Sequence, residues 1–197
     1  MNTQAIFFSF DMFGSPGTAS GVHLLADEIR EILADNRRET VPTRADAYST
    51  DLRLREIDFP NLASLEKWRE RGRKLARPVF QSGEFLLWFS GNHLGTLPLY
   101  DELSLATDKV VVLQFDAHLD IHHFRDCSSE LSHGNFLRHC AGPLPPLINL
   151  GHRDLLLPRD TISEYFQSAF SVVDLVRDSQ AVLRSVQSQL SKADRVF

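Results

Sequence analysis

Short apolar runs recur along the chain, and they constrain its fold more than any other feature. FLLWF at 85–89, VVVLQF at 110–115 and LINL at 147–150 each contain at most one polar residue. Such runs are typical of strands that are covered on both faces. A further run, QAIFFSF at 4–10, reads as another buried strand. The sequence therefore predicts a buried β-sheet.

Segments with helical spacing of apolar residues separate these runs. The expected helices cover 22–33, 62–80, 98–106 and 178–192, and further strands are expected at 52–59 and 171–175. Because strands that alternate with helices form βαβ units, we predict an α/β fold with a mostly parallel sheet.

No internal repeat, low-complexity segment or linker divides the 197 residues, so a single domain over 1–197 is expected. The last helix is expected to end near Lys192, and residues 193–197 have the pattern of a turn and the start of another strand. A core strand needs neighbours for its backbone groups. We therefore expect a domain that is incomplete at its C-terminus, with the C-terminal strands missing.

Composition argues against several classes of function. The chain has 21 basic and 26 acidic residues, a net charge of −5, which disfavours binding to nucleic acid or to an anionic membrane. Its apolar runs are much shorter than the roughly 20 residues that span a bilayer. The N-terminal segment lacks the basic start of a signal peptide. Only Cys127 and Cys140 are present, so two free thiols and a cytoplasmic location are expected.

The polar residues that follow VVVLQF form the candidate site. Asp116, His118 and Asp120 alternate directly after this run, and ligands bind beyond the carboxyl ends of the strands in open α/β sheets. In an extended backbone, residues two apart lie about 6.6 Å apart on one face. His93 follows FLLWF in the same way, within SGNHLG.

Carboxylates mixed with imidazoles suit manganese, iron or zinc better than calcium. The sequence therefore predicts a metal site at these strand ends. Its expected ligands are His93, Asp116, His118 and Asp120.

These motifs carry a family resemblance. FDAHLDIH at 115–122, preceded by SGNH and followed by LSHGNFLR, resembles the ureohydrolases, the family of arginase, agmatinase and formiminoglutamase. That family has a GGDH motif, then DAHxD, then a histidine-glycine motif, then a strand that ends in G-[IL]-R. The last motif corresponds here to NLGHRDL at 149–155. The similarity covers nearly the whole chain.

The resemblance implies an arginase-like, three-layer α/β/α fold around a binuclear manganese centre. It places His93, Asp116 and Asp120 around one ion and His118 at the other, with Asp116 as the bridge. His133 takes the position of a proton-shuttling histidine. The implied activity is hydrolysis of C–N bonds in linear amidines or guanidino compounds, which releases urea or a similar amide. Family members are commonly oligomers, so a homo-oligomer is also implied.

Other polar residues near these motifs have no clear catalytic counterpart. His122 and His123 are expected at the rim of the site. Arg153 and Asp154 are expected to be structural.

The chain departs from the family pattern at several points. Asn92 replaces the acidic residue of GGDH, and Leu156 replaces a carboxylate that some arginases use to recognise their substrate. The D-x-D motif of a later strand is not found before Phe197. Two divalent ions would bring four positive charges against the two negative charges of Asp116 and Asp120, at a steep Coulomb cost. At most one well-held ion is therefore expected.

Two alternatives to this hydrolase stay open. The first is a degenerate, non-catalytic relative that binds a partner. The second is a binuclear metallophosphoesterase, since that class also uses D-x-H and GNH motifs. However, its D-x-H comes first, whereas GNH precedes DAHLD here and the intervening GDxxD is missing.

Overall fold

The computed structural model describes residues 2–14, 17–38, 51–106, 109–122, 130–154 and 156–197. His123 and Cys127 lie outside these residues. The chain divides into two compact units, Met1–Leu99 and Tyr100–Phe197. The single domain expected over 1–197 stays a prediction.

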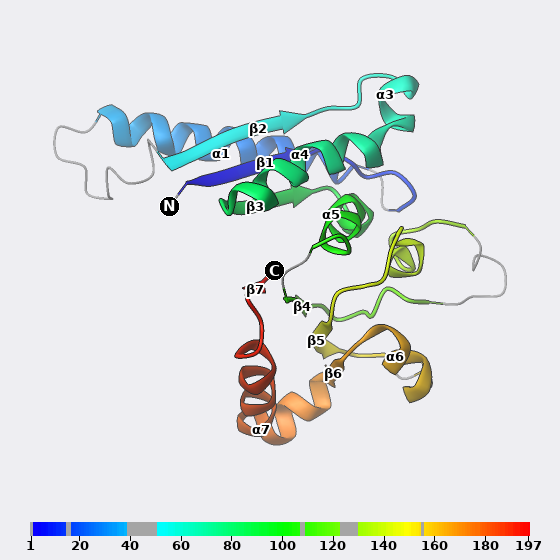
Figure 1. Cartoon of the computed structure of the whole chain (residues 1–197). Helices are drawn as coiled ribbons and strands as arrows, with labels where there is room; N and C mark the ends of the chain where they lie inside the picture. The colour runs from blue at the N-terminus through cyan, green and yellow to red at the C-terminus, as the bar shows by residue number, and fades with distance from the viewer. Residues whose placement is uncertain (1, 15–16, 39–50, 107–108, 123–129, 155) are drawn as a thin grey trace. The chain divides into compact units, whose positions relative to one another are not determined.

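The first unit is built on a three-stranded sheet with the order β2-β1-β3. Its elements are β1 (Thr3–Phe8), α1 (Ala19–Arg38), β2 (Leu52–Ile57), α3 (Leu62–Glu66), α4 (Trp68–Ser82), β3 (Phe85–Ser90), a 3-10 helix (His93–Thr96) and the start of α5 (Leu97–Leu103). Both strand pairs are parallel, and the three arrows point the same way in Figure 1. The carboxyl ends of these strands therefore lie at one edge.

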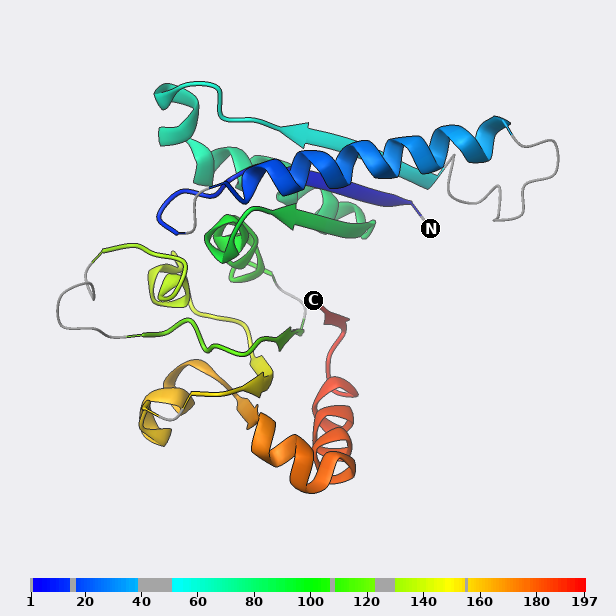
Figure 2. The ribbon, with the colours of Figure 1, turned by 180° about the vertical axis from the view of Figure 1, so that it is seen from behind.

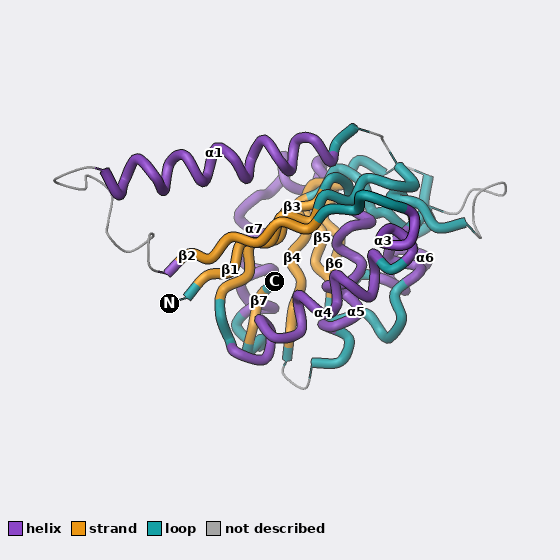
Figure 3. The backbone as a smooth tube through the Cα atoms, turned by 90° about the horizontal axis from the view of Figure 1, so that it is seen from above, coloured by secondary structure: helices purple, strands orange, loops and turns teal. Residues whose placement is uncertain are grey.

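Helices cover both faces of this sheet. Alternate residues of β1 point to opposite sides, and both Phe7 and Phe8 are buried. Phe7 stacks on Phe89 with ring centroids 4.9 Å apart, within the core cluster that includes α1. Phe8 points the other way, with its ring centroid 4.9 Å from that of Trp88. A Cβ on Gly72 of α4 would lie 3.3 Å from the Phe8 ring, so α4 packs closely on this second face. Figures 2 and 3 show α1 and α4 on opposite sides of the strands.

The single helix expected over 62–80 is wrong, because the structure has two helices. The backbone leaves helical geometry at Lys67, between α3 and α4. The break allows Trp68 to stack on Phe10 with ring centroids 4.3 Å apart, whereas Leu62 stays 75% exposed. A packing contact to a distant strand end, which helical periodicity does not encode, decides this break.

The second unit is built on a four-stranded sheet with the order β6-β5-β4-β7, in which every pairing is parallel. After the end of α5, its elements are β4 (Val110–Phe115), a 3-10 helix (Phe136–His139), β5 (Leu147–His152), α6 (Arg159–Tyr165), β6 (Ser168–Ser171), α7 (Val172–Leu190) and β7 (Arg195–Val196). Helix α7 packs on one face, where Val182 and Val186 join Val111, Ile148 and Leu150 in one core cluster.

The strand expected at 171–175 is wrong, since the strand ends at Ser171 and α7 begins at Val172. Ser171 and Asp174 form a capping box. The Ser171 hydroxyl accepts from Asp174 N at 3.2 Å, and the Asp174 carboxylate accepts from Ser171 N at 2.9 Å. These bonds satisfy amide groups that the first helical turn leaves unpaired, so the cap outweighs the β preference of the two valines that follow.

Helix α7 changes direction at Asp178, whose φ of −154° and ψ of 78° are non-helical. The Asp178 carboxylate accepts from Ala181 N at 2.9 Å and so caps the second half of the helix. This second half corresponds to the helix expected at 178–192.

Parallel sheets with flanking helices confirm the predicted α/β class. Among the residues that the structure describes, no helix combines the length and apolar character needed to cross a bilayer.

Candidate metal centre

In the second unit, the DAHLD segment begins where β4 ends. The strand stops at Phe115, and Asp116 is the first residue beyond it. The backbone then turns, and Asp120 has a φ of +52°, in the left-handed region that aspartate tolerates better than most residues. The backbone therefore does not stay extended from Asp116 to Asp120.

The turn nevertheless brings the two carboxylates together. A carboxylate oxygen of Asp116 and one of Asp120 lie within 4.8 Å of each other. Asp120 is 4% exposed, and its neighbours Leu119 and Ile121 are fully buried. These apolar side chains anchor the turn on both sides of Asp120. Because the anchored turn fixes the Asp120 backbone, its carboxylate is held beside that of Asp116.

Both oxygens of Asp116 accept hydrogen bonds. Oδ1 accepts from the backbone N–H of His118 at 2.9 Å, and Oδ2 accepts from Nε2 of Gln114 at 3.5 Å. The backbone of this residue is tied to the next strand, since Asp116 N donates to Leu150 O at 3.2 Å. The Asp116 carboxylate therefore has a defined orientation at the strand end.

His118 lies beside this carboxylate but faces outwards. Its Nδ1 is 3.7 Å from Oδ1 of Asp116, and its side chain is 63% exposed. Its role as a ligand stays a prediction.

In the first unit, His93 begins the 3-10 helix that follows β3, and its side chain is exposed. Asn92 caps this helix, because its Oδ1 accepts from Leu94 N at 3.1 Å. Its Nδ2 donates to Met12 O at 3.1 Å, in the segment that follows β1. An amide supplies both an acceptor and a donor here, which an ionised carboxylate does not. Asn92 therefore has a structural reason to replace the acidic residue of the family motif.

Gly91, which precedes this cap, allows two strand ends to approach closely. A Cβ at this position would lie 2.7 Å from Phe10 O and 3.1 Å from Ala19 N. Only glycine avoids that clash. The GNH motif is thus a packing motif as well as the segment that carries His93.

His133 is exposed in the second unit, in a loop that Asn135 holds. Asn135 accepts from Ser132 N at 2.8 Å and donates to Glu130 O at 2.7 Å. The backbone N–H of His122 donates to Gly134 O at 3.1 Å, which joins this loop to the end of the DAHLD segment. The histidine-glycine loop is therefore anchored beside the candidate ligands of this unit, and the role of His133 stays a prediction.

His122 and Asp154 interact, which their positions in the sequence do not predict. Nε2 of His122 lies 3.5 Å from Oδ2 of Asp154, whose side chain is only 5% exposed. Oδ1 of Asp154 accepts from Leu156 N at 3.0 Å and Leu157 N at 3.2 Å. Asp154 therefore links the loop after β5 to His122. No spacing rule relates these residues, because they come from different strand ends.

Two buried titratable groups lie in the same unit. Burial lowers the pKa of His152, although the charges of Asp154 and Asp174 oppose that shift. Burial also raises the pKa of Tyr100 well above its ordinary value, and electrostatic interactions with Cys140, Asp120 and Asp116 add to that shift. Both groups are therefore neutral at pH 7.

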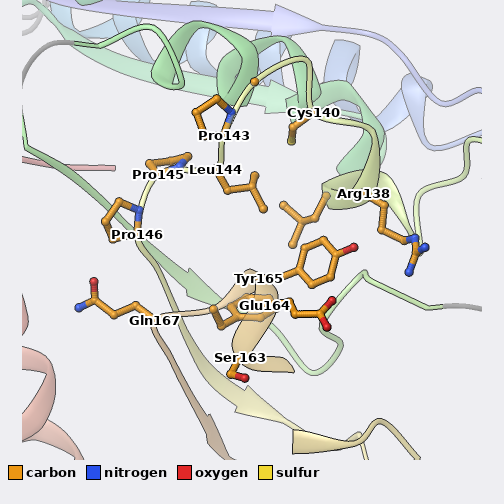
Figure 4. A pocket seen from close by; sticks show the side chains of 13 residues that line it. Arg138, Cys140, Pro143, Leu144, Pro145, Pro146, Ser163, Glu164, Tyr165 and Gln167 are labelled. Atoms are coloured by element: carbon orange, nitrogen blue, oxygen red, sulfur yellow. The ribbon is translucent and has the colours of Figure 1, made fainter. Parts of the chain in front are cut away.

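A cavity of about 550 Å³ lies elsewhere in this unit (Figure 4). The segment Pro143–Pro146 forms one side of it, and Ser163, Tyr165 and Gln167 line another. These residues precede the starts of β5 and β6, so the cavity lies at the amino ends of the strands. None of the predicted site residues lines it. It is thus separate from the acidic turn at the opposite edge.

Parallel strands with an acidic turn at their carboxyl edge define an α/β protein with a candidate metal site. The model of the Arginase family matches residues 4–197, so the chain belongs to the Arginase family, whose members are hydrolytic enzymes. This membership favours the ureohydrolase interpretation over the metallophosphoesterase alternative. No significant match is found among curated protein sequences.

Solved structures with a similar fold include three from this group. Arginase from Bacillus subtilis is 20% identical with a TM-score of 0.73, and the match covers 100% of this chain and 72% of that chain. Helicobacter pylori arginase is 20% identical with a TM-score of 0.67, and the match covers 100% of this chain and 73% of that chain. Formimidoylglutamase from Bacillus subtilis is 14% identical with a TM-score of 0.61, and the match covers 100% of this chain and 63% of that chain. At these identities the similarity establishes an arginase-like fold.

Proposed function

We propose that this chain is a manganese-dependent hydrolase of C–N bonds in linear amidines or guanidino compounds, and that it releases urea or a similar amide. The observation that carries the proposal is the pair of carboxylates at the end of β4, with oxygens within 4.8 Å of each other. Membership of the Arginase family supports the same reaction class.

The donor set fits a hard or borderline divalent ion. We propose His93, Asp116 and Asp120 as the ligands of one ion, and His118 as a ligand for a second where one binds. Two carboxylates and an imidazole supply oxygen and nitrogen donors, which suit manganese better than a thiolate-loving metal. The two carboxylates carry two negative charges and so balance one divalent ion. One well-held ion per chain is therefore expected.

A divalent ion held by these residues would lower the pKa of a bound water to about 7 and so would provide the nucleophile. The protein's part is to orient that chemistry. Asp116 is held by Gln114 and by the His118 backbone, and Asp120 by its buried turn. The leaving amine needs a proton, and a histidine exposed to solvent is suited to relay one. We propose His133 for this role.

The proposed substrate is a small amidino or guanidino compound. Leu156, an exposed leucine, stands where some arginases carry a carboxylate for substrate recognition. Agmatine-like or formimino substrates are therefore as well supported as arginine. The free thiols predicted from the sequence support a cytoplasmic location.

The test is a panel of arginine, agmatine, formiminoglutamate and related compounds, incubated with the chain and Mn²⁺. Urea, ammonia and formamide are measured. We expect one compound to be hydrolysed, and we expect Asp120→Asn or a chelator to abolish the reaction. If no compound is hydrolysed above the Asp120→Asn background, the degenerate, non-catalytic alternative replaces this proposal.

A further inference from the structure

On the face of the second unit's sheet that lies away from α7, the side chains change from apolar to polar along the strands. Val111 and Leu113 of β4 pack on the α7 side, so Val112 and Gln114 point to the other side. Val112 is the register partner of Leu147, and Gln114 is the register partner of Asn149. Along this face, apolar residues are followed by a pair of amides, and Asp116 lies just beyond the end of β4. We call Gln114 and Asn149 the amide pair.

Each member of the amide pair donates to the DAHLD segment. Gln114 Nε2 donates to Oδ2 of Asp116 at 3.5 Å. Asn149 Nδ2 donates to the carbonyl oxygens of Asp116 and His118 at 3.4 and 3.5 Å. The carbonyl of Ala117, which lies between them in the sequence, accepts from the backbone N–H of Arg153, the residue after β5, at 2.9 Å. Three successive carbonyls of the turn are therefore held by β5 and its extension, and the Asp116 side chain is held by β4.

The amide pair is unfavourable for the fold itself. Gln114 Oε1 and Asn149 Oδ1 are buried, and within the described residues neither has a hydrogen-bond partner. Asn149 is fully buried. An unpaired buried acceptor destabilises the folded state, whereas an apolar side chain of the same shape does not. Stability alone therefore does not explain two amides at adjacent positions in the sheet.

We propose that Gln114 and Asn149 are positioning residues for the metal centre. Gln114 sets the rotation of the Asp116 carboxylate, and Asn149 sets the backbone of the turn that brings Asp120 to it. Both donate through their amide N–H groups, so the DAHLD turn is held in place while the two amide oxygens stay unpaired. The inference rests on the proposed metal site, because it gives the amide pair a purpose only if Asp116 and Asp120 share an ion.

The experiment compares wild type with Gln114→Met and Asn149→Leu. Mn²⁺ affinity is measured by titration calorimetry and by electron paramagnetic resonance, and stability by thermal melting without metal. We expect affinity about tenfold lower in each variant, as for other groups that orient metal ligands. The melting temperature of Gln114→Met should equal or exceed that of wild type. Gln189→Met is the matched control, because Gln189 pairs with Gln167 at 2.6 Å away from the DAHLD segment.

The outcomes separate this inference from the proposed function. If wild type binds Mn²⁺ and both variants bind it equally well, the amide pair has no positioning role and the inference is wrong. A Gln114→Met chain that melts far below wild type shows that this amide serves the fold, and overturns the inference as well. A wild type that binds no Mn²⁺ overturns the metal proposal itself.

Discussion

The carboxylates of Asp116 and Asp120 offer oxygens within 4.8 Å of each other at the end of β4. Asp120 is almost completely buried. Two negative charges this close repel each other, and a cation bound between them reduces that repulsion. An ion bound here therefore stabilises the fold in addition to its proposed chemical role.

Asp120→Asn is expected to raise the melting temperature of the metal-free chain, because it removes one of two repelling charges. It should also abolish the stabilisation by Mn²⁺, which for the wild type reaches about 2.7 kcal/mol at a concentration 100 times Kd. Thermal melts with and without Mn²⁺ measure both effects. Asp160→Asn, at an exposed position in the first turn of α6, is the control. Equal gains from Mn²⁺ in Asp120→Asn and wild type would refute the site.

Substitutions of the two proposed histidine ligands are expected to have different effects. Elemental analysis of the wild type should give one manganese per chain, because Asp116 and Asp120 balance one divalent ion. His93→Ala should lower the affinity for this ion by at least about tenfold. His118→Ala should change its affinity little, since His118 is assigned to a second ion and is mainly exposed. Two tightly held ions in wild type, or equal losses in both variants, would contradict this assignment.

Burial of His152 is expected to make stability depend on pH. The pKa of this group lies below its ordinary value of 6.5 in the folded state. Below pH 6.5 the unfolded chain therefore binds more protons at this group, and its contribution increasingly favours unfolding until the pH falls below the folded-state pKa. Above pH 6.5 the effect disappears.

Urea denaturation at about pH 7.5 and about pH 5.5 measures this contribution. The loss of unfolding free energy on acidification should be smaller in His152→Asn than in wild type, because asparagine does not titrate. His133→Asn, at an exposed position, is the matched control. An identical loss in wild type and His152→Asn would show that His152 has no role in the pH dependence.

The cap of α7 is expected to contribute measurably to stability. Ser171→Ala removes the hydroxyl that accepts from Asp174 N, and should lower the unfolding free energy by about 1 kcal/mol. It should also raise the pKa of Asp174, since hydrogen bonds from Ser171 are the main cause of its lowered value. Urea denaturation and NMR titration measure these effects. Ser163→Ala, within α6, is a serine control without a capping role. No change in either quantity would mean that the cap does not define the start of α7.

Much of the fold could be predicted because local patterns carry it. The apolar runs at 85–89, 110–115 and 147–150 all lie in strands, and the strands pair in parallel within each of the two sheets. Two predicted elements are wrong because a helix cap or a tertiary contact outweighs the local pattern. Residues 171–175 have β-branched character, yet a serine cap starts a helix there. Residues 62–80 have helical periodicity, yet packing of Trp68 divides them.

Covalent order and spacing are local properties, so they are enough to show which chemical groups follow the strands and which family the motifs resemble. How Asp116 and Asp120 meet depends on the folded backbone, which is left-handed at Asp120. The fold also brings Asn149, 29 or more residues along the chain from the DAHLD segment, to the position where it holds that turn. Hydrogen bonds between distant residues form only after the strands pair, and no local pattern encodes them.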